Sequence, residues 1–459
     1  MRQKSRYILD GPVPSTLVKM TVPSVVGMLG MMIFNVVDAY FVGRLGALEL
    51  AAISFTFPVV MVIGSIVLGI GMASMALFSR AAGNKNIEEE RLLATSTFTL
   101  GVSISIVTGI IGYLTIKPLF RLLGADDALM PLIVTYMKIW YLGAAFMVIP
   151  MLGDSILRGL GDTFTPAFVM MTVAVVNLVL DPILIFGLGP FPAMGIAGAA
   201  VATIFARGIA AVVSILIQVF REHLIIIRGL SLRKVWEKWK ALFHIGLPNS
   251  AVKAILPLGV AIFTSILAGY GHETVAGFGV ATKIESLFMA VINAFGITAT
   301  VFVGQNLGAG NASRVTQGIR FLRFFVMMLG FIAAVLCFFG GNFMSGLFND
   351  DPAVRAATTG YLAIVPFGYG FTGLVQIGAS ILNVYHKPFL AGGLSLVQIG
   401  LIAVPAAYFL SLLMGMNGVF VAILASFVVT GMISTGIVNR ETAEQMSVFD
   451  TDSRAPVPS

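Results

Sequence analysis

Two acidic residues stand inside long apolar stretches of this sequence, and each follows an asparagine at helical spacing. Asp38 comes three residues after Asn35, and Asp181 comes four residues after Asn177. On a helix these spacings place both members of each pair on one face. A charge inside a membrane costs roughly 2.5–3.5 kcal/mol on insertion scales, so both acids indicate a functional site. The alternative for Asp38 is exposure to water beside Arg44.

The residue after Asp181 adds a third kind of oxygen ligand. Pro182 has no backbone N–H, so the carbonyl of Leu178 is left without its helical hydrogen bond. A carboxylate, an amide and a free carbonyl together suit a proton or a sodium ion. We therefore expect Asp38, Asn177 and Asp181 to form a cation site.

Other polar residues in apolar stretches are candidates for charge balance, substrate binding or gating. Arg207 can neutralise one of the acids, and Thr203, one turn earlier, can supply an oxygen ligand. Asn35 and, in the second half of the chain, Glu285 are candidates for substrate binding or gating. The alternative is that Glu285 pairs with Lys283 or Lys253.

Two further acids are better explained by local structure. Asp154 lies four residues before Arg158, which predicts an ion pair along one helix face. Asp162, in the sequence Gly161-Asp162-Thr163, is typical of a turn followed by a helix cap.

Other kinds of site lack the residues they require. The single cysteine, Cys337, excludes an internal disulfide and a thiolate metal cluster. The four histidines are scattered, and no phosphate-binding loop or serine–histidine arrangement is present. We therefore expect no enzymatic activity, no resident metal and no cofactor.

The composition predicts an all-α membrane protein. Of the 459 residues, 58% are hydrophobic and only 11% are charged, whereas about a quarter of a soluble protein is charged. A membrane helix needs about 20 mostly apolar residues. Twelve such spans are expected, at 16–42, 52–78, 93–116, 131–152, 164–187, 194–220, 241–268, 275–301, 319–340, 358–382, 388–413 and 417–438.

The positive charges predict the orientation of these spans. With both termini cytoplasmic, 20 of the 28 Lys and Arg residues lie in cytoplasmic segments and four in outer loops. The net charge of +7 therefore reflects membrane orientation rather than nucleic-acid binding. We expect a multi-pass protein of the inner (plasma) membrane, with Asp38 and Asp181 both in its outer half.

The chain also matches itself at a shift of 225 residues. The matched pairs include Pro23 with Pro248, Gly46 with Gly271, Gly83 with Gly308, Tyr136 with Tyr361, and Ser155-Ile156-Leu157 with Ser380-Ile381-Leu382. Beyond residue 190, the match of Gly195 with Gly418 gives a shift of 223. Two pseudo-symmetric six-helix lobes are predicted, at 1–220 and 241–440, with a basic cytoplasmic linker at 221–240 and a polar tail at 441–459. Duplicated lobes of this kind are typical of secondary transporters.

Several motifs resemble those of the multidrug and toxic compound extrusion (MATE) family, in its DNA-damage-inducible-protein-F-like branch. The resemblance covers about residues 10–440. It rests on Phe34-Asn35-Val36-Val37-Asp38, Gly43-Arg44-Leu45-Gly46, Leu157-Arg158-Gly159-Leu160-Gly161-Asp162-Thr163, Asn177-Leu178-Val179-Leu180-Asp181-Pro182, Lys283-Ile284-Glu285 and Gly304-Gln305-Asn306-Leu307-Gly308.

The resemblance implies export of cationic or amphipathic drugs in exchange for protons or sodium ions, by alternating access. In that branch the first lobe holds the cation, which implies roles for Asp38, Asn177 and Asp181, with Thr203 as an added ligand. Pro23 matches the proline at which the first helix bends, and Tyr136 matches an aromatic residue near the cavity. A second-lobe acid used by other branches has no equivalent in the seventh span, which contains Lys253 instead.

The expected partners are small organic cations and the lipid bilayer, and the chain is expected to be a monomer. The alternative function is that of a lipid-linked saccharide flippase, which should carry more basic residues in its cavity. The sequence leaves the choice between proton and sodium open.

Overall fold

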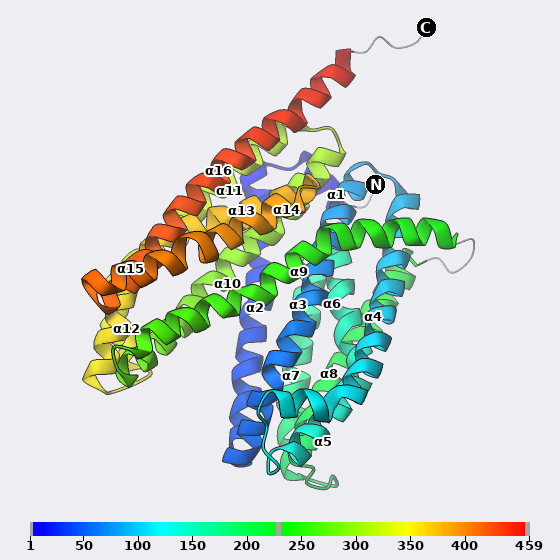
Figure 1. Ribbon diagram of the computed structural model, residues 1–459. Helices are drawn as coiled ribbons and strands as arrows, with labels where there is room; N and C mark the ends of the chain where they lie inside the picture. The colour runs from blue at the N-terminus through cyan, green and yellow to red at the C-terminus, as the bar shows by residue number, and fades with distance from the viewer. Residues whose placement is uncertain (1–2, 226–230, 455–459) are drawn as a thin grey trace. The chain divides into compact units, whose positions relative to one another are not determined.

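The computed structural model describes residues 3–225 and 231–454, apart from some side chains within helices; the gating candidate Asn35 is among the side chains outside the description. No strand occurs in these ranges. The elements, labelled in Figure 1, are α1 (Gln3–Asp10), α2 (Val13–Gly43), α3 (Ala47–Gly83), α4 (Ile87–Leu122), α5 (Met130–Leu142), α6 (Ala144–Gly159), α7 (Phe164–Phe186), α8 (Ile196–Leu216), η1 (Ile217–Arg221), α9 (Leu232–Ala268), α10 (His272–Gly308), α11 (Ala312–Gly346), α12 (Pro352–Ile364), η2 (Val365–Gly368), α13 (Tyr369–Val384), α14 (Pro388–Leu396), η3 (Val397–Ala403), α15 (Val404–Met414) and α16 (Met416–Arg454).

The expected membrane architecture is confirmed. Within the described residues, eleven helical segments are long and apolar enough to span a bilayer. The pair α5 and α6, bent by 50°, makes a twelfth span. The bend falls at Gly143, and the repeat-related Gly368 ends the short η2 segment that separates α12 from α13. The same span is therefore interrupted in both halves of the chain.

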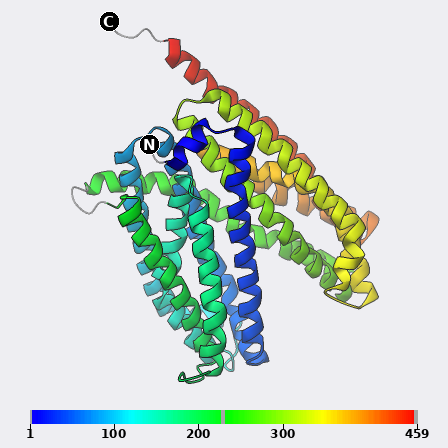
Figure 2. The ribbon, with the colours of Figure 1, turned by 180° about the vertical axis from the view of Figure 1, so that it is seen from behind.

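The chain forms two compact units. The N-terminal unit contains Pro23–Ala82 and Asn86–Ser250, and the C-terminal unit contains Met1–Val22, Gly83–Lys85 and Ala251–Ser459. In the N-terminal unit α6 packs on α4 and α8, and α7 packs along α8 (Figure 2). In the C-terminal unit α13 packs on α10, α11 and α16.

Two helices pass from one unit to the other at repeat-related positions. The division in α2 falls at Pro23, and the division in α9 falls shortly after Pro248, between Ser250 and Ala251. Because an internal proline removes one helical hydrogen bond, both crossings coincide with weak points of the helix.

Side chains on either side of Pro23 bind to different units. The hydroxyls of Thr21 and Thr298 on α10 lie 2.8 Å apart within the C-terminal unit. Arg158 on α6 donates to the Ser24 hydroxyl at 3.3 Å within the N-terminal unit. The start of α2 is thus fixed to one unit and its longer remainder to the other.

Glycine contacts correct the predicted register of the final helix in each half. A Cβ added at Gly198 would lie 2.4 Å from the Leu184 carbonyl oxygen, and one at Gly418 would lie 2.0 Å from that of Leu410. These matching close approaches give a shift of 220 for α8 and α16, not the expected 223. The reason is the connection before them, because α7 and α8 are joined by residues 187–195 whereas Gly415 alone joins α15 to α16.

An ion pair occurs at equivalent positions in both units, with its charges reversed. In the N-terminal unit, Arg221 pairs with Asp162 at 2.6 Å. In the C-terminal unit, Lys387 pairs with Glu441 at 3.2 Å. A shift of 225 residues aligns Asp162 with Lys387, and a shift of 220 residues aligns Arg221 with Glu441. Asp162 also accepts hydrogen bonds from the backbone N–H and the hydroxyl of Thr165, which confirms its predicted capping role.

Candidate functional site

The centre of the site is the Asn177–Asp181 turn of α7. Both side chains have 0% exposure, and Pro182 follows inside the same helix. Neither carboxylate oxygen of Asp181, nor the amide oxygen of Asn177, has a hydrogen-bond partner among the described residues. Burying an unpaired polar atom costs about 1–3 kcal/mol, and more for a charged group. These oxygens therefore favour binding of a cation or a proton.

Helices α2 and α8 bring two more predicted residues to this turn. The Asn177 amide nitrogen donates to the Thr203 hydroxyl on α8 at 3.5 Å. Asp38 on α2 lies close enough to Asp181 for their charges to interact. Two acids, an amide and a hydroxyl from three different helices therefore meet in one place.

Tyr136 on α5 and Arg207 on α8 complete the site, since both interact electrostatically with Asp38. The part of the chain that the structure describes contains no group of three or more His, Cys, Asp or Glu residues able to hold a metal ion. Two carboxylates with neutral oxygen donors suit a proton or sodium ion better than a multivalent metal, for which more charged ligands are usual. The predicted constellation is therefore assembled within a single unit, apart from Asn35.

Glu285 lies in the other unit, away from this constellation. The Tyr361 hydroxyl on α12 donates to the Glu285 carboxylate on α10. No ion pair joins Glu285 to Lys253 or Lys283 among the described residues, so the alternative expectation of such a pair is wrong. The partner was missed because Tyr361 is 76 residues away in sequence. The sequence signal for this partner is the alignment of Tyr361 with Tyr136, which is expected near the cavity.

Asp154 also differs from its expectation. It is 7% exposed, and its Oδ1 atom has no hydrogen-bond partner among the described residues. Arg158, the expected partner, donates instead to the Ser24 hydroxyl and approaches the Met170 sulfur at 3.9 Å. Both side chains are described, and no ion pair within 4.0 Å forms between them. Helical spacing allowed contact, but the longer side chain of Arg158 reaches other helices.

A family model named MatE matches residues 23–183 and again residues 248–409. The two matches begin at the repeat-related residues Pro23 and Pro248, and together they cover more than half of the chain. The chain belongs to the MatE family. This confirms the resemblance drawn from the sequence motifs, and it makes the chain a membrane transporter rather than an enzyme.

Relatives of this MatE member share nearly its whole length. A protein of Shewanella oneidensis named FAD transporter is 34% identical over 422 residues, covering 92% of this chain and 93% of the relative. A Bacillus subtilis protein named probable multidrug resistance protein YpnP is 27% identical, covering 92% and 94%. The crystal structure of the Vibrio cholerae MATE transporter VcmN, D35N mutant, is 26% identical, with a TM-score of 0.89 and coverage of 96% and 99%.

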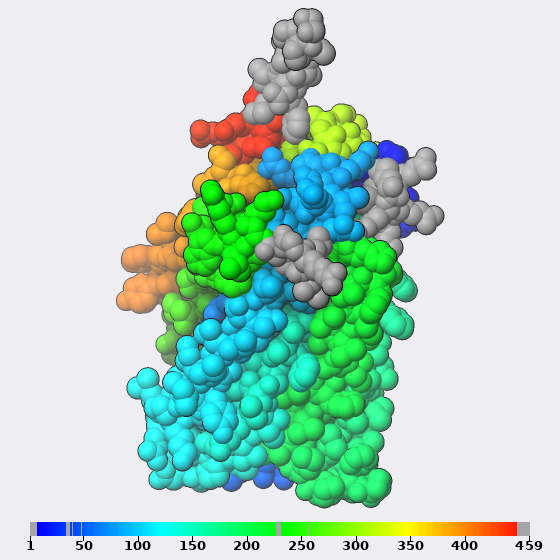
Figure 3. Space-filling view, turned by 90° about the vertical axis from the view of Figure 1, so that its right-hand side faces the viewer, coloured from blue at the N-terminus to red at the C-terminus, as the bar shows by residue number. Residues whose placement is uncertain are grey.

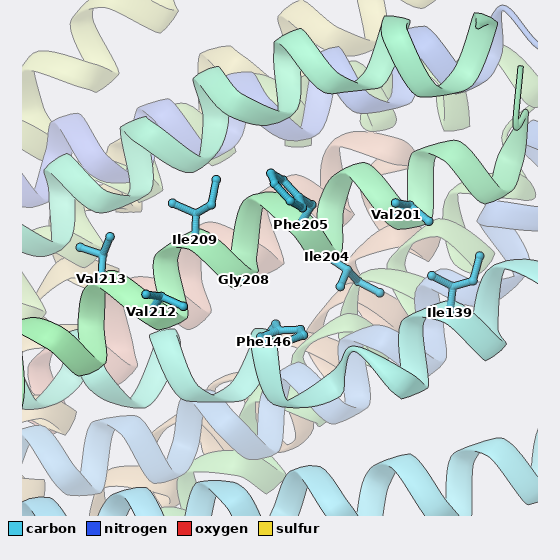
Figure 4. Close-up of a pocket in the computed structure, with 9 residues that line it drawn as sticks. All are labelled: Ile139, Phe146, Val201, Ile204, Phe205, Gly208, Ile209, Val212 and Val213. Atoms are coloured by element: carbon cyan, nitrogen blue, oxygen red, sulfur yellow. The ribbon is translucent and has the colours of Figure 1, made fainter. Parts of the chain in front are cut away.

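The outer face of the N-terminal unit of this MatE member is apolar, as a membrane protein requires. Leu114 on α4 is 72% exposed and Phe205 on α8 is 57% exposed; helices of this unit appear in cyan to green in Figure 3. A groove of about 500 Å³ lies on α5, α6 and α8 and is lined by residues such as Ile139, Phe146 and Phe205 (Figure 4). Its apolar lining offers no oxygen ligands, so the carboxylate site is the better place for a cation.

Proposed function

We propose that this transporter exports amphipathic or cationic compounds in exchange for protons or sodium ions, and that Asp38 and Asp181 bind the cation. The observation that carries the proposal is the buried, unpartnered Asp181 carboxylate beside the charge of Asp38. The name of the B. subtilis relative supports multidrug export. Each of the two acids stands five residues before the last residue of its helix, so they enter the site at similar depth.

The excess of Lys and Arg in alternate loops supports a cytoplasmic location of both termini in the inner (plasma) membrane. In that orientation α2 and α7 run outward, and Asp38 and Asp181 lie near the outer surface. A cation can then reach them from outside when the transporter is open to that side.

The exchange of a drug for a cation follows from the charges of Asp38 and Asp181. A cation that binds between the two acids removes their mutual repulsion and weakens their attraction for a positively charged drug, which leaves to the outside. The transporter then returns to the inward-open state, and the cation leaves to the cytoplasm. Bending of α2 at Pro23, where the helix passes between units, accompanies this step. Each charge crossing a membrane at ~100 mV gains about 2.3 kcal/mol, which sustains a gradient of roughly fortyfold.

The test is ethidium transport by the purified chain in liposomes, with proton and sodium gradients imposed separately. The wild-type chain should respond to one of them, and Asp38→Asn should lose that response. Glu441→Gln is a matched control, because it also removes a buried carboxylate, but one that is already paired with Lys387. Ion-driven transport by Asp38→Asn at the wild-type rate would exclude the proposal.

A second candidate substrate is an anionic dinucleotide. The FAD transporter of S. oneidensis supports it at 34% identity over nearly the full chain. In this chain the guanidinium of Arg207 lies near the acids of the N-terminal unit and suits a phosphate group. Competition between FAD and ethidium for export from loaded liposomes decides between the two substrate classes.

A further inference from the structure

Asp154 is a buried acid to which the exchange described above gives no role. It lies on α6, five residues before the end of that helix, whereas Asp38 and Asp181 lie at the opposite end of the N-terminal unit in the proposed orientation. Its Oδ1 atom has no partner in the described part of the chain, and Arg158 is engaged with Ser24. A carboxyl in this position needs either a proton or a counter-charge from another helix.

Arg158 contributes the larger charge interaction with Asp154, and Arg207 on α8 contributes a smaller one. Of the two, the guanidinium of Arg207 also interacts electrostatically with Asp38. The Nε atom of Arg207 is buried, with no hydrogen-bond partner among the described residues. Arg207 stands eleven residues after Ile196, which is about 16 Å along α8 and places it at mid-depth between the two acids.

The other charged or titratable groups that face these three side chains belong to the same unit. Tyr136 on α5 faces Arg207 and Asp38, Asp181 on α7 faces Asp38, and Arg158 faces Asp154. One guanidinium is therefore shared by two acids at different depths. It cannot fully neutralise both at once, because charge interactions weaken with distance.

We propose that Asp154 is a second proton-binding carboxyl of the transport reaction and shares the guanidinium of Arg207 with Asp38. The inference rests on the proposed function and takes the proton as the coupling ion. When a proton from outside forms an O–H bond on Asp38, that acid loses its charge and releases Arg207. Arg207 then stabilises the charge of Asp154, whose O–H bond breaks, and that proton leaves to the cytoplasm.

Charge and protons balance in this exchange. Asp38 changes from charged to neutral, Asp154 changes from neutral to charged, and Arg207 keeps its charge throughout. One proton enters from outside and one leaves inside in this step. In the inward-open state Asp38 then releases its proton to the cytoplasm and Asp154 takes one up from there, so the starting charges return and each cycle moves one proton inward. Arg207 is a positioning residue that communicates the state of one acid to the other.

Two variants should shift the pH dependence of ethidium transport in opposite directions. In Asp154→Asn, Arg207 is no longer shared and keeps Asp38 charged, so the profile should move toward acid by roughly one pH unit or more. In Arg207→Gln, Asp38 loses its counter-charge, so the profile should move toward alkaline pH. Arg207→Lys keeps the charge and should restore part of the wild-type profile.

A second measurement counts protons directly. Ethidium is added to the detergent-solubilised chain in weak buffer, and the pH change is recorded. Wild-type protein should release few protons on binding, because Asp154 takes up a proton when Asp38 loses one. Asp154→Asn should release more protons while still binding ethidium. The control is Glu441→Gln, which should match wild type in both measurements. Thermal unfolding identifies any variant that fails to fold, and Arg207→Gln then provides the independent test.

Unchanged pH profiles in both Asp154→Asn and Arg207→Gln, or the same direction of shift in both, would overturn the inference. Equal proton release by the wild-type protein and by Asp154→Asn on ethidium binding would overturn it as well. These outcomes are distinguishable from failure of the proposed function, because in that case Asp38→Asn itself would keep ion-driven transport.

Discussion

The two halves of the chain have the same order of helices but differ in the charged residues that these helices carry. The 225-residue shift puts Phe263 at the position of Asp38 and Ala379 at that of Asp154. The later helices of the two halves are aligned by their matching close contacts between glycine and a leucine carbonyl. That alignment puts apolar residues at the two remaining charged positions, Phe427 at that of Arg207 and Ala407 at that of Asp181.

The C-terminal unit has an acid of its own, but in a different setting. Glu285 corresponds to Val60 in the first half, and its carboxylate accepts a hydrogen bond from Tyr361. Tyr136 and Tyr361 occupy matching positions, yet Tyr136 stands near two acids and Tyr361 contacts one. Duplication preserved helix packing, while the paired acids belong to one half.

The largest effect is expected when Asp181 is replaced by alanine, the residue at the equivalent position of the second half. Asp181→Ala should lower ion-driven ethidium transport more than tenfold, because it removes a carboxylate on which the cation depends. The measurement is initial transport rate in liposomes under the coupling-ion gradient. Ala406→Ser, a small change at a neighbouring position of the second half, is the control. Equal rates for Asp181→Ala and wild type would show that the asymmetry has no role in coupling.

Removing the hydroxyl that satisfies Glu285 should reduce stability more than removing its repeat partner. Tyr361→Phe leaves the half-buried Glu285 carboxylate without its donor, which costs about 1 kcal/mol of unfolding free energy. Tyr136→Phe should cost less, because no hydrogen bond of its hydroxyl is found among the described residues. Thermal unfolding of both variants in one detergent makes the comparison. A larger loss for Tyr136→Phe would contradict it.

Neutralising Glu285 tests whether the second half contributes to coupling. Glu285→Gln should change ethidium affinity by a few-fold and leave the dependence on the coupling ion intact, since an amide can still accept from Tyr361. Transport rates at varied ethidium concentration, with and without the ion gradient, provide the measurement. Loss of ion dependence would show that both units take part in cation binding.

The reversed ion pairs should give the smallest effect. Asp162→Lys alone should destabilise the chain by about 1 kcal/mol, because it removes the cap on Thr165 and places a second positive charge beside Arg221. Adding Arg221→Glu copies the polarity of Lys387 and Glu441 and should recover part of that loss. Unfolding temperatures of the single and double variants measure it. A double variant less stable than Asp162→Lys would show that the two pairs are not equivalent.

Much of this molecule could be predicted from the sequence, because hydropathy and repeated glycines and prolines report helices directly. The acids Asp38 and Asp181 were predictable, since a charge in an apolar span is easily recognised. The partners of Asp154 and Glu285 were not, because they depend on which helices pack together. Helical spacing suggested Arg158 for Asp154, but tertiary packing directs that side chain to Ser24. The register of α16 depended on a loop length that sequence matching did not resolve.

The passage of α2 and α9 between units has a consequence for the origin of the fold. Residues at the start of each repeat group with the unit formed mainly by the other repeat. A single ancestral repeat would have made the same arrangement by exchanging its first helix end with a second copy, which is a domain swap. Joining the two copies in one chain makes such an association independent of protein concentration.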